Sequence, residues 1–125
     1  RYDLVILRHV LEHLPDPIKA MNQISALLKK DGYTLLEFPN IEGFKYKLKR
    51  LINNTGIRKK KYSADWVPGH CQEFCRKSIE FLLAKTGFAL IDYQTYTRSG
   101  TANLIYHHIH IGNKARVLAR KSRES

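Results

Sequence analysis

The sequence lacks the features that mark several special classes of protein. No apolar run approaches the roughly 20 residues that cross a membrane, and no secretory signal peptide is visible. Its 125 residues include only two cysteines, Cys71 and Cys75. So few cysteines exclude a disulfide-stapled scaffold and favour two free thiols in a reduced, cytoplasmic setting. A single globular domain is the expectation from this length and composition.

Acidic residues are also scarce, with 11 against 22 basic residues and a net charge of +11. The basic excess is uneven, because residues 44–64 contain no Asp or Glu and the C-terminal segment 113–125 reads as a basic tail. Eight basic residues fall in the first of these segments: Lys45, Lys47, Lys49, Arg50, Arg58, Lys59, Lys60 and Lys61. Such a run is ordinarily a solvated face, but it also predicts an anionic partner for Lys45–Lys61: a phosphate group, a nucleic acid or an acidic membrane.

The first third of the chain reads as a strand, a helix and a second strand. Leu4–Leu7 is a short apolar run of the kind expected for a strand buried on both faces of a parallel sheet. Apolar residues then recur at three- and four-residue steps, which predicts a helix over Pro17–Lys30. Tyr33–Phe38 is the next apolar run. This order predicts a βαβ unit with parallel strands.

The rest of the chain predicts two more helices and a hairpin. Residues 41–69 follow no single period and form a basic insertion, in which Phe44–Asn53 favours a short amphipathic helix that could lie on a membrane surface. A helix over residues 76–86 precedes a strand at Phe88–Tyr96, and a second strand at Leu104–Ile111 pairs with it in an antiparallel hairpin. The fold class is therefore α/β, with two parallel strands and a C-terminal antiparallel hairpin flanked by helices.

Polar side chains gather directly after the first strand, where open α/β sheets bind their ligands. His9 to His13 match the zinc-peptidase pattern H-x-x-E-H, which requires the two histidines to lie on one helix. Pro15 and Pro17 interrupt any such helix, so zinc hydrolysis is not favoured. His70 with Cys71 and Cys75 offers three soft ligands but no fourth, which does not favour a structural zinc site.

Three segments in order also resemble a known family. YDLVILRHVLEHLPDP, KKDGYTLLEFPN and HCQEFCRKSIEFLLAKTGF are similar to class I S-adenosylmethionine-dependent methyltransferases of the type 11/23-like group. The resemblance covers residues 2–96 and matches the C-terminal half of that Rossmann-like domain. The glycine-rich loop and the first three strands of the family have no counterpart here, and the chain begins without Met, so we expect residues 1–125 to be a fragment.

The resemblance implies roles for single residues. Arg8, His9 and Val10 would border the cofactor S-adenosylmethionine, and Asn40 would face the methyl acceptor together with Trp66 of the basic insertion. His70 is the candidate general base, because the pKa of histidine lies near neutrality, although it could equally shape its loop.

No metal site is predicted. Glu12 and His13 correspond to metal-holding residues of some quinone O-methyltransferases, but a loop-shaping role is the simpler reading. His108 and His110 share one face of the expected strand 104–111 and are read as solvated.

The predicted function is S-adenosylmethionine-dependent methylation of a small-molecule acceptor. The alternatives are a non-catalytic methyltransferase-like module that binds anionic partners, and a nucleic-acid methyltransferase in which Tyr46, Tyr62 and Trp66 stack on bases. Residues 1–125 alone are expected to bind the cofactor weakly or not at all. The strand at residues 3–8 would present an unpaired edge through which the chain could self-associate.

Overall fold

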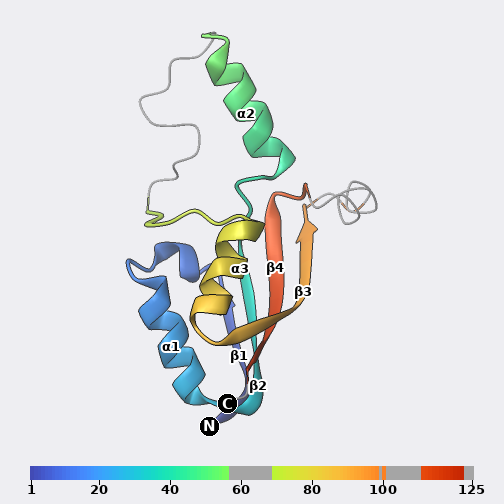
Figure 1. Cartoon of the computed structure of the whole chain (residues 1–125). Helices are drawn as coiled ribbons and strands as arrows, with labels where there is room; N and C mark the ends of the chain where they lie inside the picture. The colour runs from blue at the N-terminus through green and yellow to red at the C-terminus, as the bar shows by residue number, and fades with distance from the viewer. Residues whose placement is uncertain (57–68, 99, 101–110, 123–125) are drawn as a thin grey trace.

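The protein is an α/β fold built on one mixed sheet, seen here in a computed structural model that describes residues 1–56, 69–98, 100 and 111–122 (Figure 1). The elements follow one another as β1 (Tyr2–Arg8), the 3-10 turn η1 (Leu11–His13), α1 (Pro17–Leu27), β2 (Leu28–Pro39), α2 (Phe44–Asn54), α3 (Arg76–Lys85), β3 (Phe88–Tyr96) and β4 (Lys114–Lys121).

The sheet has the strand order β1-β2-β4-β3. β1 and β2 are parallel, whereas β4 lies between β2 and β3 and is antiparallel to both. The connection from β1 to β2 passes through α1, as a parallel pair requires. The predicted fold class, two parallel strands and a C-terminal antiparallel pair, is confirmed.

The hydrophobic core lies between the sheet and the two helices α1 and α3 (Figure 1). Apolar side chains from one face of each helix meet alternate side chains of the central strands, as the periods of helix and strand dictate. The fully buried members of this core from these elements are Met21, Ile79, Leu83, Leu28, Leu36, Phe38, Ala115, Val117 and Ala119.

Local chemistry sets the limits of α1. The Asp16 carboxylate caps the helix by accepting a hydrogen bond from the Lys19 backbone N–H at 2.9 Å. The helix ends at Leu27, earlier than predicted, and β2 begins at the next residue. The chain makes a left-handed turn at Asp31, just before Gly32, with a φ of 61°. Asp tolerates this conformation better than most residues, so the turn does not need glycine.

The prediction that Leu4–Leu7 is buried on both faces is wrong. β1 is an edge strand of the described sheet, and Leu4 and Ile6 are 45% and 55% exposed. Val5 and Leu7 point the other way and pack against the core. The difference arises because α1 and α3 cover one face of the sheet, while no described helix covers the face that holds Leu4 and Ile6.

The prediction of a basic tail at residues 113–125 is also wrong, because β4 occupies Lys114–Lys121 in the middle of the sheet. Small and branched side chains at alternate positions face the core, while Arg116 and Arg120 point to the opposite, exposed face. The basic residues therefore reflect strand alternation. The strand predicted at Leu104–Ile111 falls almost wholly outside the described residues.

α2 confirms the amphipathic helix predicted in the insertion, and none of its residues is buried. It extends from the carboxyl end of β2 away from the sheet (Figure 1). No helix in the described part of the chain is long and apolar enough to cross a membrane. The predicted helix over 76–86 is confirmed as α3, and Gly87 follows it with a φ of 74°.

Candidate functional site

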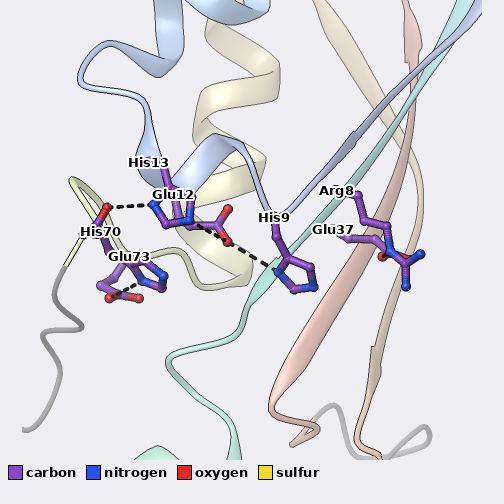
Figure 2. Close-up of polar contacts among 8 residues, drawn as sticks. Arg8, His9, Glu12, His13, Glu37, His70 and Glu73 are labelled. Atoms are coloured by element: carbon purple, nitrogen blue, oxygen red, sulfur yellow. Dashed lines mark hydrogen bonds and ion pairs between the residues drawn. The ribbon is translucent and has the colours of Figure 1, made fainter.

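The carboxyl ends of β1 and β2 lie side by side because the two strands are parallel and hydrogen-bonded. The backbone of His9 takes a left-handed conformation there, with a φ of 54°, and donates its N–H to the Glu37 carbonyl at 2.8 Å. A positive φ is uncommon outside glycine and turns the chain sharply. This turn leads into η1 and brings the His9 ring towards Glu12, with 3.4 Å between Nδ1 and Oε1 (Figure 2).

Glu12 is a buried carboxylate at the centre of the site and is 1% exposed. Its Oε1 lies 3.4 Å from His9 Nδ1 and 4.0 Å from His13 Nε2, whereas Oε2 has no hydrogen-bond partner among the described residues. A buried carboxylate costs free energy unless donors or positive charge surround it. Of the two rings, that of His9 lies closer to the carboxylate, and its Nδ1 can carry a proton towards Oε1.

Glu12 and His13 also hold the segment that precedes α3. The Glu12 carbonyl accepts hydrogen bonds from the backbone N–H groups of Cys71 and Gln72 at 2.8 and 3.1 Å. His13 Nδ1 donates to the Gly69 carbonyl at 2.7 Å, and because a carbonyl oxygen only accepts, this nitrogen carries the proton. These bonds place the segment at the carboxyl end of β1, as a loop-shaping role for Glu12 and His13 requires.

His70, the predicted general base, lies in this cluster. Its Nδ1 is 3.0 Å from Glu73 Oε1, and its ring meets that of His13 edge to face, with 4.8 Å between centroids (Figure 2). The His70 side chain is 11% exposed. A carboxylate at one ring nitrogen fixes the orientation of the imidazole and leaves the other nitrogen for proton transfer. The role of His70 in catalysis stays a prediction, and this geometry is compatible with it.

Glu12, His13 and His70 are also the described residues best placed to hold a metal ion. One ligand atom from each lies within 4.8 Å of the others. A tetrahedral zinc site with bonds of about 2.1 Å brings its ligands to within roughly 3.5 Å of one another, so this cluster is wider than such a site. The helical H-x-x-E-H arrangement is not formed, because His9 ends the strand and η1 has only three residues.

Tyr46 of α2 belongs to the same region. Burial raises the pKa of the Tyr46 phenol, and the negative charges of Glu73 and Glu12 raise it further. The sequence suggests Tyr46 only as a stacking platform for nucleic acid. Tyr46 lies in the first turn of a helix that starts near the end of β2, and this position is the sequence signal that could have marked it as a site residue. The sequence does not show which way the helix turns Tyr46, because tertiary contacts set the orientation of the helix.

Arg8, predicted to border the cofactor, makes an ion pair on the exposed face of the sheet. Its Nε donates to Glu37 Oε2 at 2.6 Å, and Arg116 Nε donates to Glu37 Oε1 at 2.6 Å. Burial raises the pKa of Glu37, but the hydrogen bonds and charges of Arg116 and Arg8 outweigh it and hold the pKa below its usual value. Glu37 was missed in the sequence because its partners lie 29 and 79 residues away.

The other predicted site residues differ in their surroundings. Val10 exposes 41% of its surface beside the end of β1. Asn40 is 1% exposed, and its side chain donates to the Gly112 carbonyl at 2.9 Å and accepts from the Glu42 N–H at 3.2 Å. These bonds give Asn40 a structural task, and its contact with an acceptor stays a prediction. Trp66 lies outside the described residues.

The family model described as "Methyltransferase domain" matches residues 1–93. A comparison with curated protein sequences finds no match.

Solved structures share the fold at low sequence identity. A SAM-dependent methyltransferase of Thermotoga maritima superposes with a TM-score of 0.64 at 16% identity, over 96% of this chain and 56% of that one. A SAM-dependent methyltransferase of Archaeoglobus fulgidus gives 0.59 at 19% identity, over 95% and 59%. A Burkholderia thailandensis 1,6-didemethyltoxoflavin-N1-methyltransferase, solved with S-adenosylhomocysteine, gives 0.59 at 18% identity, over 98% and 45%. This chain therefore spans about half to three fifths of the length of these structures.

Proposed function

The chain belongs to the methyltransferase domain family, and we propose that it forms the C-terminal half of the catalytic domain of a SAM-dependent enzyme that methylates a small-molecule acceptor. The observation that carries this proposal is the meeting of polar side chains from β1, η1 and the segment before α3 at the carboxyl end of a parallel strand pair. Ligands of open α/β sheets bind at this edge.

The exposed side of β1 supports the proposal that more of the domain packs there. Leu4 and Ile6 are 45% and 55% exposed on a strand whose composition suits a buried position. A further parallel strand beside β1 and a helix over Leu4 and Ile6 would remove this apolar surface from water. The proposed domain thus accounts for a surface that residues 1–125 leave exposed.

The residues after β1 fit one side of a cofactor of this class. Val10 offers an exposed apolar surface, and the left-handed turn at His9 presents that surface at the strand end. S-adenosylmethionine, when bound, supplies a methyl group on a positively charged sulfur. The sequence contains no G-x-G-x-G segment to cradle the rest of the molecule, so residues 1–125 alone would bind it weakly.

His70 would take the proton that the acceptor loses. We assign this role because Glu73 binds Nδ1 and orients the ring, so that Nε2 can accept a proton from an O–H or N–H group. Glu73 would then stabilise the imidazolium ion. Tyr46, whose phenol stays protonated because burial raises its pKa, would donate a hydrogen bond that positions the acceptor.

The test is a methyl-transfer assay on protein that carries the complete domain. His70→Asn should lower kcat by about 10²- to 10⁴-fold, the usual contribution of a general base, and leave the affinity for S-adenosylhomocysteine unchanged. Glu73→Gln should lower kcat less and shift the pH profile. Cys71→Ser, an exposed neighbour in the same segment, is the matched control and should keep full activity. Wild-type kcat in His70→Asn would remove the assigned base.

A further inference from the structure

α2 adds no side chain to the hydrophobic core that the described residues form. Its eleven residues include no buried side chain, yet four of them are large and apolar. Their exposed fractions are 48% for Phe44, 44% for Leu48, 64% for Leu51 and 40% for Ile52. A water-exposed helix this apolar is unusual unless its apolar face is covered by something else.

The apolar residues form one continuous stripe along α2. At about 100° per residue, Phe44, Leu48, Leu51 and Ile52 fall within an arc of about 100°. Lys45 borders one side of this arc and Lys47 borders the other. Two lysines that flank an apolar stripe can extend their charged ends to the level of lipid headgroups while their stems cover apolar surface.

The domain holds α2 so that this stripe faces away from the candidate site. Tyr46 lies on the opposite side of the helix from the stripe, and the charges of Glu73 and Glu12 act on its phenol. The N-terminus of α2 is fixed by the Asn113 side chain, which accepts a hydrogen bond from the Lys45 N–H at 2.9 Å. The helix is thus anchored at one end, with its polar side towards the site.

The charge of α2 and the residues after it indicates what kind of surface covers the apolar stripe. Residues 44–64 hold eight basic and no acidic residues, so the region repels cations and attracts an anionic surface. We propose that α2 lies in the plane of an anionic membrane, with Leu48, Leu51 and Ile52 inserted between lipids and Lys45 and Lys47 at the headgroups. This helix of about 16 Å would rest on the membrane and not cross it.

A lipid surface explains the stripe better than nucleic acid does. Bases stack on aromatic rings, whereas three of the four side chains of this stripe are aliphatic and offer no such platform. Phosphate contacts alone would need the lysines but would leave the aliphatic side chains in water. Membrane binding of this kind is independent of methyl transfer, so it stands or falls separately from the proposed function.

The test is sedimentation of the 125-residue chain with phospholipid vesicles. We expect binding to phosphatidylcholine vesicles that contain about 30% phosphatidylserine, and little binding to pure phosphatidylcholine. Lys45→Gln/Lys47→Gln should weaken binding about 25-fold, since each basic residue near the surface contributes about fivefold. Leu48→Ser/Leu51→Ser should weaken it at least about tenfold, because two apolar anchors are lost.

The matched control is Phe81→Ser on α3, which removes an apolar side chain that is 64% exposed, as Leu51 is. It should bind vesicles like the unchanged chain. Equal binding by Leu48→Ser/Leu51→Ser, or loss of binding in Phe81→Ser, would overturn the proposal. Stronger binding to an oligonucleotide than to the anionic vesicles, unaffected by the leucine substitutions, would assign the lysines to nucleic acid instead.

A second measurement places the helix by depth. The chain contains a single tryptophan, so Trp66→Phe/Leu51→Trp carries a reporter only on the stripe, and Trp66→Phe/Phe81→Trp carries one only on α3. Vesicles with brominated acyl chains should quench the reporter at residue 51 and spare the one at residue 81. Equal quenching of both reporters, or of neither, would contradict insertion of the stripe.

Discussion

At the scale of single residues, Glu37 joins the two halves of the described chain. Its buried carboxylate receives Arg8 from β1 and Arg116 from β4, so one acidic side chain ties the three strands together. Arg116 also lies over the Tyr96 ring, with 5.2 Å from its guanidinium carbon to the ring centroid. The pKa of Glu37 is lowered in the folded protein, so its ionised form contributes to stability.

Glu37→Gln should make the protein less stable at neutral pH and change its response to acid. Because the folded pKa is below the ordinary value of 4.5, the stabilisation is complete above that pH and is lost as pH falls below it. The arginines are partly exposed, so we expect a loss of about 1–2 kcal/mol. Urea denaturation at pH 7 and pH 3 measures the free energy of unfolding. The difference between the unchanged chain and Glu37→Gln should narrow at pH 3.

Glu80→Gln is the control for that measurement. Glu80 pairs with Arg76 on the surface of α3, and both side chains are well exposed. Surface pairs of this kind contribute less than about 0.5 kcal/mol. A constant stability gap between the unchanged chain and Glu37→Gln at both pH values would contradict the role given to Glu37.

Some of these residues could be predicted from the sequence, and others could not. Arg8, His9, Glu12 and His13 stood out because they follow a recognisable strand directly. Glu37 lies inside a predicted strand, and its role as an ion-pair partner depends on the register that puts it opposite Arg116. Register is a tertiary property, so this role could not be predicted from the sequence.

At the scale of elements, helices and parallel strands were predictable because their signals are local. Apolar periodicity located α1 and α3, and an apolar run located β1. β4 was missed because its core-facing positions hold only Ala115, Val117 and Ala119, and four of its eight residues are arginine or lysine. Small residues and alternating charge give a weak apolar signal, although the strand is central.

Two truncated chains test whether folding requires β4 and whether it requires the residues after Ser122. A chain that ends at Asn113 should fail to fold, because it removes the partner of both β2 and β3 and exposes the side chains packed on Val117. A chain that ends at Ser122 should retain the stability of the full sequence. Circular dichroism and thermal unfolding of both chains give the answer, and a cooperative transition in the shorter chain would contradict the account.

At the scale of the whole molecule, β1 is an edge strand of the described sheet and exposes apolar side chains on one face. Unpaired strand edges promote association between chains, so we expect residues 1–125 to self-associate through β1. Ile6→Lys should shift the chain towards monomer, because it places a charge on that face. Ile91→Lys on β3, where the isoleucine is 50% exposed, is the control and should not. Light scattering over a concentration series measures the molar mass of the unchanged chain and of the two variants. Equal masses for all three would contradict self-association through β1.

The proposed function requires the carboxyl end of β1 to border the methyl donor. The most direct test is a titration with S-adenosylhomocysteine, followed by NMR, of isotope-labelled protein that carries the complete domain. We expect saturable binding, with amide shifts concentrated at His9, Val10 and Leu11 and none along α2. Shifts that saturate at another surface, or an unchanged spectrum at the end of β1, would contradict it.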